Sequence, residues 1–251
     1  EEFYRRAIEA DPNNAAHLSN YANFLQNIRH DYEREGEFYP RAIEANPEHA
    51  AHLGNYANFL MVVRHDHERA EEFYRRAIEA DPNNAAHLSN YANFLRTIRN
   101  NYEQAEEFYR RVLEVGPGNA FVLANFAQLL FAQGRKAEGA ALIEQIRNDD
   151  DSSLPLQTEV SFYRYAHQLD DPSVALARLK RALTEGGRSP GWNLEPNIAR
   201  ARLDGHPNLP LLEALAAVIT EDESLETLQV FPEWRAAGSS LDALAVPMPV
   251  A

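Results

Sequence analysis

The chain has 251 residues, of which 45% are hydrophobic, and a formal net charge of −14 at pH 7. A surface of this sign repels the phosphates of nucleic acids and of anionic membranes, which disfavours both as partners. The sequence has no cysteine, which excludes a disulfide framework, a thiol nucleophile and a zinc knuckle. It shows no signal peptide and no apolar run of about 18 residues, and we expect a cytoplasmic location.

The first 25 residues recur letter for letter at residues 71–95. A diverged copy covers residues 36–60 and a weaker one covers residues 106–130, so the copies start 35 residues apart. Self-similarity at this period predicts a stacked array and not one closed globule. The chain starts in mid-repeat, and we therefore expect it to be part of a longer protein.

Each repeat unit is predicted to be a hairpin of two helices. In the unit that begins at Asn84, apolar residues recur with helical spacing at Leu88, Tyr91, Ala92, Leu95 and Ile98. Asn83 or Asn84 can cap this helix, and a second apolar helix is predicted from about Tyr102. The segment 81–84 contains a proline and ends the preceding helix. Stacking of hairpins buries both apolar stripes, which one hairpin cannot do alone.

These residues resemble the tetratricopeptide repeat family over about residues 1–148. The matching positions are Ala92, Ala105, Phe108, Tyr109, Ala77 and Pro82, with Leu88 at the family's usual Trp and Tyr91 at its usual Leu. The resemblance implies an all-α fold, a right-handed α-solenoid of helical hairpins. The period of 35 exceeds the family's usual 34, and the extra residue falls in the turn around Arg29 and His30. The copy that starts at Ala120 has a shorter turn and fits 34.

The second unit departs from its siblings at two positions. Glu35 and Gly36 replace the Ala-Glu pair of the other units, and Pro40 replaces the arginine found at Arg75 and Arg110. A proline inside a helix costs about 3 kcal/mol. The helix near residues 33–45 is therefore predicted to be kinked or weakened.

The pattern changes after residue 148. We predict a tetratricopeptide array of about four hairpins over 1–148, an acidic linker over 149–155 and a degenerate hairpin over 156–188. An irregular helical cap over 189–236 and a mobile tail over 237–251 complete the chain. A terminal cap is expected to be irregular because one of its faces has no neighbouring repeat.

Two columns of amide side chains recur once per unit on the first helices. The first column is Asn20, Asn55, Asn90 and Asn125, and the second is Asn23, Asn58, Asn93 and Gln128. Residues three apart share a helix face, so both columns are predicted to line one surface. An amide offers a donor and an acceptor, which suits the backbone of an extended peptide. The alternative is that some of these side chains cap or bridge neighbouring helices. The resemblance implies that the first helices line a concave groove that holds peptides.

Side chains between the columns are expected to give specificity. Arg96 is one such position, and Phe121 and Phe131 are predicted to form an apolar anchor; their alternative role is packing against the C-terminal cap. The family's carboxylate clamp uses Lys and Arg at positions that are here occupied by Ala16, Ser19, Ala51, Gly54, Ala86 and Ser89. A chaperone-type C-terminal acidic peptide is therefore not expected as the ligand.

No catalytic motif is present: the chain lacks a phosphate loop, a nucleophile elbow and a dinucleotide fingerprint. The recurrent His17, His52 and His87 are predicted to pack between units. His65 and His67, with His30 one unit earlier, match no established metal site. We predict no enzyme activity, no cofactor and no metal.

The sequence thus predicts a protein–protein interaction scaffold that binds a peptide or a partner segment in its groove. One alternative is a regulatory or sensor arm of a larger multidomain enzyme; a remote one is an RNA-binding helical repeat, which the acidic charge opposes. The N-terminal helix, with Phe3, Tyr4 and Ile8 exposed, could support self-association.

Overall fold

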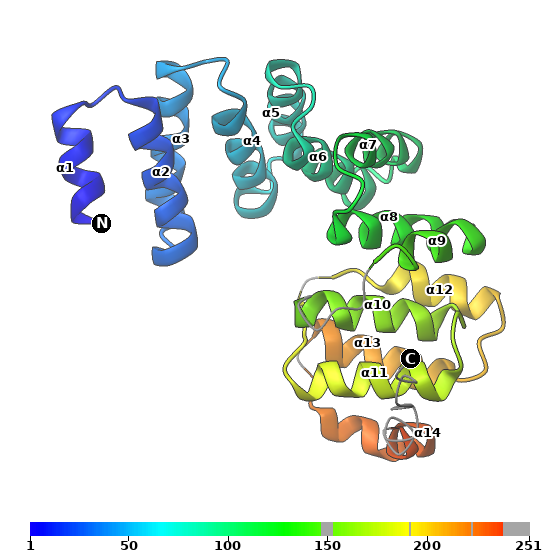
Figure 1. Cartoon of the computed structure of the whole chain (residues 1–251). Coiled ribbons are helices and arrows are strands. Elements are labelled where there is room, and N and C mark those ends of the chain that lie inside the picture. The colour runs from blue at the N-terminus through cyan, green and yellow to red at the C-terminus, as the bar shows by residue number, and fades with distance from the viewer. Residues whose placement is uncertain (147–152, 191, 222, 238–251) are drawn as a thin grey trace, which may run out of the picture. The chain divides into compact units, whose positions relative to one another are not determined.

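The computed structural model describes residues 1–146, 153–190, 192–221 and 223–237. Over these residues the chain is all-α, as predicted, and contains no strand. No helix in the described part is both long and apolar enough to cross a membrane. The chain divides into two compact units, Glu1–Pro117 (unit 1) and Gly118–Ala251 (unit 2) (Figure 1).

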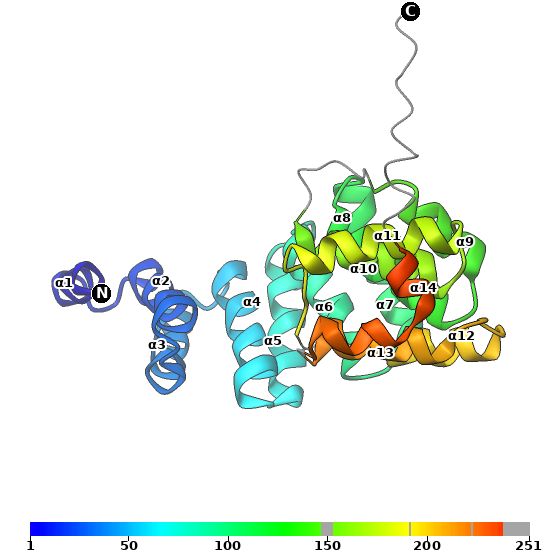
Figure 2. The same ribbon diagram turned by 90° about the horizontal axis from the view of Figure 1, so that it is seen from below.

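Unit 1 consists of successive helical pairs (Figures 1 and 2). Its first helix packs on the second, and the next six pair as α2 with α3, α4 with α5, and α6 with α7. Helix α3 also contacts α4, and α5 contacts α6, so apolar stripes are buried between the hairpins of unit 1. The bounds are α1 (Glu2–Ala10), α2 (Ala15–Phe24), α3 (Tyr32–Ala45), α4 (Ala50–Phe59), α5 (His67–Ala80), α6 (Ala85–Thr97) and α7 (Tyr102–Val115).

Side-chain caps set where these helices begin. Asn14 and Asn84 accept hydrogen bonds from backbone N–H groups in the first turns of α2 and α6, as predicted for Asn84. The second helices begin in the same way after Asp31, Asp66 and Asn101. His49 occupies the capping position of α4 and makes no such bond. Caps depend only on neighbouring residues, which is why the sequence predicts these boundaries well.

The extra residue of the 35-residue period widens the turn that ends each first helix. The π-helical turns η1 (Leu25–Arg29) and η2 (Leu60–Arg64) extend α2 and α4. The closing bonds run from Asp31, Asp66 and Asn101 N–H to the carbonyl six residues earlier, at 2.9–3.1 Å. The residue before each donor is left-handed, with φ of 53° at His30, His65 and Asn100. In the 34-residue unit the closing bond from Arg135 to Leu130 spans five residues, and Gly134 is the left-handed residue.

Alanines and tyrosines form the core of unit 1. Ala22, Ala57 and Ala92 on the first helices are fully buried, as are Ala70 and Ala105 on the second. Their small side chains let the paired helices approach closely. The space beside them is filled by large aromatic residues that are almost fully buried, namely Tyr21, Tyr39, Tyr56, Tyr74, Tyr91 and Tyr109.

Unit 2 contains the fourth hairpin and the C-terminal helices. These are α8 (Ala120–Ala132), α9 (Lys136–Ile143), α10 (Leu154–Ala166), α11 (Pro172–Thr184), α12 (Glu195–Leu203), α13 (Leu209–Thr220), the 3-10 helix η3 (Leu225–Val230) and α14 (Pro232–Ala236). Helices α10 and α11 pack against each other as a hairpin. The fourth hairpin, α8 and α9, belongs to the same compact unit as the C-terminal helices. The domain bounds predicted from the sequence stay a prediction. Most of the predicted linker and nearly all of the predicted tail lie outside the described residues.

Pro40 lies inside α3, which is uninterrupted from Tyr32 to Ala45. The proline therefore does not divide the helix. It still removes one backbone donor and places its ring against the carbonyl of Gly36, which weakens a helix without ending it. Its side chain is exposed, so no tertiary contact offsets this cost.

We predict that Pro40→Arg, which copies Arg75 and Arg110, raises the free energy of unfolding by about 2–3 kcal/mol. Urea unfolding followed by circular dichroism measures the change. Pro40→Ala serves as a control, because it also restores the donor and should give a similar gain. Unchanged stability in both variants would contradict the explanation.

Glu35 occupies the buried position that Ala70 and Ala105 hold in the next two hairpins. Its side chain is fully buried, and neither carboxyl oxygen has a hydrogen-bond partner. Burial raises the pKa of Glu35 from 4.5 to about 7, and the positive charge of Arg64 opposes the rise. Between these two values the folded chain keeps a proton that the unfolded chain has released. The free energy of unfolding therefore falls as the pH rises from about 4.5 to about 7.

Glu35→Ala should remove this pH dependence and stabilise the chain at pH 8 by roughly 2 kcal/mol. The measurement is urea unfolding at several pH values between 4.5 and 8. Glu44→Ala, which removes an exposed carboxylate from the same helix, is the control and should leave the slope unchanged. If the free energy of unfolding of Glu35→Ala keeps the pH slope of the wild type, the pH dependence arises from other groups and the explanation is wrong.

Candidate peptide-binding face

The first amide column is available to a ligand in unit 1. Asn20 on α2 is exposed, and Asn55 on α4 and Asn90 on α6 are half-buried. None of these three amides makes a hydrogen bond within the described residues. Nothing in that part of the protein therefore competes for their donors and acceptors. We call the surface formed by Asn20, Asn23, Asn55, Asn58, Asn90 and Asn93 the asparagine face.

The second column is tied to the second helix of its own hairpin. The hydroxyl groups of Tyr39, Tyr74 and Tyr109 contact the Oδ1 atoms of Asn23, Asn58 and Asn93 at 2.7, 2.5 and 2.5 Å. Sequence analysis did not identify these tyrosines as part of the site. Their signal is the constant spacing of 16 residues from asparagine to tyrosine in three hairpins.

Arg96 determines the direction of the hydrogen bond in the third hairpin. Its Nε donates to the Tyr109 hydroxyl oxygen at 3.2 Å. Because a guanidinium has no acceptor, the tyrosine must use its single proton on Asn93. The Oδ1 of Asn93 thus accepts, and its Nδ2 group is the part that remains for other partners. Arg96 is half-buried and makes no ion pair within the described residues.

The residue at the position of Arg96 differs between hairpins. The first hairpin has Gln26 there and the second has Met61, whose Sδ lies 3.7 Å from the Tyr74 hydroxyl. The three hairpins thus share the tyrosine and the asparagine but present different side chains next to them. This arrangement is consistent with specificity that arises between the amide columns.

The site residues predicted in unit 2 have a different environment. Asn125 on α8 is half-buried and Phe121 is 53% exposed, so both reach the surface. Gln128 and Phe131 do not: they are 5% and 1% exposed. Their predicted exposure on an open groove is therefore wrong.

The burial of Gln128 and Phe131 has a clear cause. The Gln128 side chain donates to the Asn193 carbonyl at 2.9 Å, and the Phe131 ring stacks on His167 with centroids 4.2 Å apart. Phe131 thus packs against the hairpin predicted over 156–188, where Tyr163 and His167 lie, whereas the alternative predicted for it was packing against the cap over 189–236. Gly139 makes room for the ring, because a Cβ there would lie 2.6 Å from it. Ile143 stands where the other hairpins have the tyrosine, so Gln128 lacks that partner.

Of the three recurrent histidines, His87 packs against the preceding hairpin. His52 and His87 are buried, and a Cβ at Gly54 would lie 2.4 Å from Nδ1 of His87. His87 therefore fits against a glycine of the preceding hairpin, as predicted. Burial lowers the pKa of His52 to about 4 and also lowers that of His87, so both rings are neutral at pH 7. No three His, Asp or Glu residues in the described part lie close enough to hold a metal.

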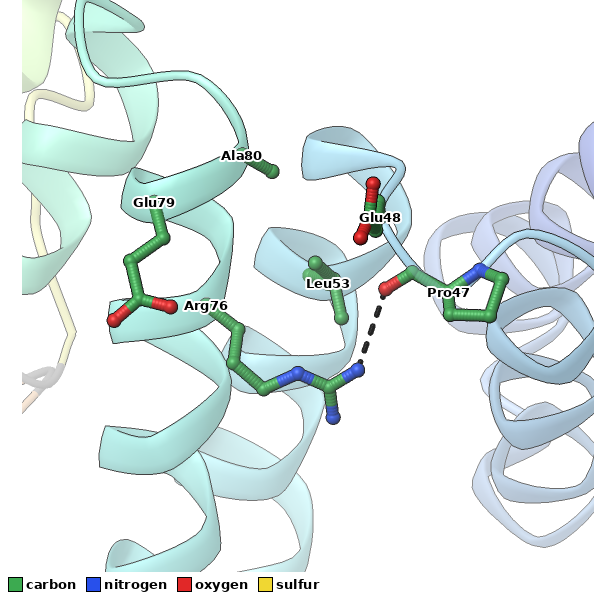
Figure 3. A pocket seen from close by; sticks show the side chains of 6 residues that line it. All are labelled: Pro47, Glu48, Leu53, Arg76, Glu79 and Ala80. Carbon is green, nitrogen blue, oxygen red and sulfur yellow. Dashed lines mark hydrogen bonds between the residues drawn. The ribbon is translucent and has the colours of Figure 1, made fainter.

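A pocket of about 500 Å³ lies between α4 and α5, and none of the predicted site residues lines it (Figure 3). Arg76 reaches across it and donates to the Pro47 carbonyl at 3.3 Å. Arg41 and Arg111 make the same bond to Pro12 and Pro82. Because the bond recurs in every hairpin junction of unit 1, we interpret it as part of the stacking.

A second pocket, of about 530 Å³, lies in unit 2 between the ends of α10 and α11 and helix α14. Sequence analysis did not predict it. His206 lines it, with Nδ1 accepting from the Asn208 N–H and Nε2 3.2 Å from the Tyr165 carbonyl. Since Nδ1 accepts, Nε2 carries the proton and donates. Burial lowers the pKa of His206, which makes it a neutral structural residue.

Solved structures with the same fold include three helical-repeat proteins. A "PilW, widely conserved type IV pilus biogenesis factor" matches with TM-score 0.61 and 16% identity, over 86% of this chain and 97% of that one. The pilF protein of Pseudomonas aeruginosa matches with TM-score 0.59 and 20% identity, over 88% and 95%. YrrB, "a TPR protein with an unusual peptide-binding site", matches with TM-score 0.53 and 19% identity, over 80% and 96%. At these identities the likeness concerns the fold alone.

Family models describe the repeats directly. A search of curated protein sequences gave no match. Three models described as tetratricopeptide repeat match residues 97–157, residues 3–35 and 73–107, and residues 39–85. Together they cover more than half of the sequence, and the chain therefore belongs to the tetratricopeptide repeat family.

Proposed function

We propose that unit 1 binds an extended peptide segment of a protein partner on its asparagine face. The observation that carries this proposal is the set of unpaired amides at Asn20, Asn55 and Asn90, repeated every 35 residues on three first helices. Asn20 is exposed, Asn55 and Asn90 are half-buried, and none of the three is a buried group without a partner. Water therefore hydrates these amides in the free protein, and the backbone of a bound peptide can take the place of that water.

An extended peptide matches this surface chemically. Its N–H and C=O groups recur along its length, and each asparagine can pair with one of either kind. Contacts of this type bind the peptide backbone, which is the same for every sequence. The side chains between the two amide columns must therefore select the peptide's amino-acid sequence. YrrB, which shares the fold and has an unusual peptide-binding site, supports this use of the repeats. The proposal assigns no reaction or cofactor to the chain, and a cytoplasmic location stays a prediction.

The double variant Asn55→Ala/Asn90→Ala tests the proposal. Binders are first selected from a random dodecapeptide display library with the whole wild-type chain, and their affinities are then measured by fluorescence anisotropy. Loss of two backbone hydrogen bonds should weaken binding by about 10- to 100-fold. Because neither amide bonds within the described residues, the free energy of unfolding should change by less than about 0.5 kcal/mol per site.

The matched control is Asn13→Ala/Asn83→Ala, which changes two exposed asparagines in the turns between hairpins and should bind as the wild type does. Failure to select any peptide, or equal affinity in both double variants, would refute the proposal.

We also propose that α1 pairs with a second copy of the chain. Phe38, Phe73 and Phe108 each pack edge-on against a tyrosine of the preceding first helix, at 4.8–4.9 Å. Phe3 holds the equivalent position in α1 and is 87% exposed, with nothing in the described residues covering it. A first helix of a second copy would cover the Phe3 ring as Tyr21 covers that of Phe38, and this burial of apolar surface would favour association.

Sedimentation velocity at 5–200 μM, roughly the range of weak dimers, should show concentration-dependent association of the wild type. Phe3→Glu should be monomeric throughout, because it places a charge at the contact. Arg5→Glu on the same helix is the control for added charge. A wild type that is monomeric at every concentration would rule out the pairing.

A further inference from the structure

Negative charge is absent from the first helices of unit 1. The chain has 38 acidic residues, yet none lies in α2, η1, α4, η2 or α6. The acidic residues of unit 1 lie on α1, on the second helices and in the turns. The asparagine face is therefore free of carboxylates in a protein whose net charge is −14. A ligand with a carboxylate meets no like charge on the helices that carry this face.

Arg96 supplies a positive charge there that no acidic residue in the described part neutralises. Two arginines near it in the repeat are ion-paired, Arg75 with Glu71 at 2.6 Å and Arg99 with the same glutamate at 2.7 Å. Arg96 uses only its Nε, on Tyr109, and its two terminal nitrogens have no partner within the described residues. The half-buried guanidinium is held by the tyrosine while these nitrogens stay available.

Asn93 adds further donors next to this cation. The hydrogen-bond chain from Arg96 through Tyr109 commits the Oδ1 of Asn93 as an acceptor, so its Nδ2 is the group that it offers. Arg96 and Asn93 flank the same hydroxyl and hence lie close together. Their available groups are all N–H donors, one set of them charged. Such a site favours a carboxylate side chain of the ligand over an amide side chain. The amide would place its own N–H donors against the donors of the site, where they could not form hydrogen bonds.

We propose that the third hairpin binds an Asp or Glu side chain of the peptide through Arg96 and Asn93, with Tyr109 as the positioning residue. The proposal rests on the function proposed above and names the chemical class of its ligand. The family's clamp positions carry no cation in this chain, so the carboxylate is that of an internal side chain. The equivalent positions Gln26 and Met61 lack the charge, which limits the acidic preference to one place along the peptide.

The test compares the wild type with Arg96→Met and Arg96→Gln. These substitutions copy the residues of the two sibling hairpins, so each is already accommodated by this fold. Dodecapeptides selected by the wild type should carry Asp or Glu at one fixed place, and those selected by Arg96→Met should not. An acidic peptide should bind either variant about 10- to 100-fold more weakly than the wild type.

A double-mutant cycle locates the contact. Replacing the peptide's acidic residue by its amide should weaken binding to the wild type by the same factor and leave binding to Arg96→Met unchanged. Tyr109→Phe keeps the ring but releases Asn93 and Arg96, so it should reduce the discrimination between acid and amide peptides by about 3- to 10-fold.

The outcomes separate this proposal from the previous one. Peptides that bind the wild type without an acidic preference, or with a preference retained in Arg96→Met, would overturn the role of Arg96 but leave the asparagine face in place. Selection of no peptide at all would overturn both.

Discussion

A buried tyrosine hydroxyl has to find a partner, and three successive hairpins of this protein provide the same one. Tyr39, Tyr74 and Tyr109 are fully buried, and each bonds to the asparagine 16 residues earlier on the paired helix. Burial raises the pKa of Tyr39 and of Tyr74, so the hydroxyl stays protonated and keeps its donor. The bond connects the core of each hairpin to its surface.

This bond links packing to the proposed peptide binding. An asparagine whose Oδ1 accepts from the core is committed as an acceptor at that atom, so the buried tyrosine sets how this side chain is used. The neighbouring column has no such bond within the described residues and keeps both a donor and an acceptor. One repeat unit therefore offers two kinds of amide. Differences such as Gln26, Met61 and Arg96 then distinguish units that are otherwise almost the same. These helices also contain no acidic residue, which supports the acidic ligand proposed above.

The fourth hairpin shows the consequence of losing this bond. Ile143 replaces the tyrosine, and Gln128 instead bonds to a carbonyl 65 residues further along the chain. Phe131 then stacks on His167, and burial lowers the pKa of that histidine to about 3. The hairpin keeps the backbone conformation of the repeat, but residues further along the chain cover Gln128 and Phe131 on its first helix. It belongs to the core of unit 2, and its first helix is a packing element there.

The sequence by itself determined the hairpins, their period and most helix ends. Apolar spacing, the caps at Asn84 and Asp66 and the turn after Arg29 act between residues close in the chain, so the amino-acid pattern contains the answer. Only the tertiary structure decided which repeated residues remain at the surface. Gln128 and Phe131 are buried by segments that the repeat pattern does not bring together, and the tyrosine that bonds to Asn93 lies on another helix. Burial depends on long-range packing, and the same position of the repeat can therefore lie at the surface in one hairpin and in the core of the next.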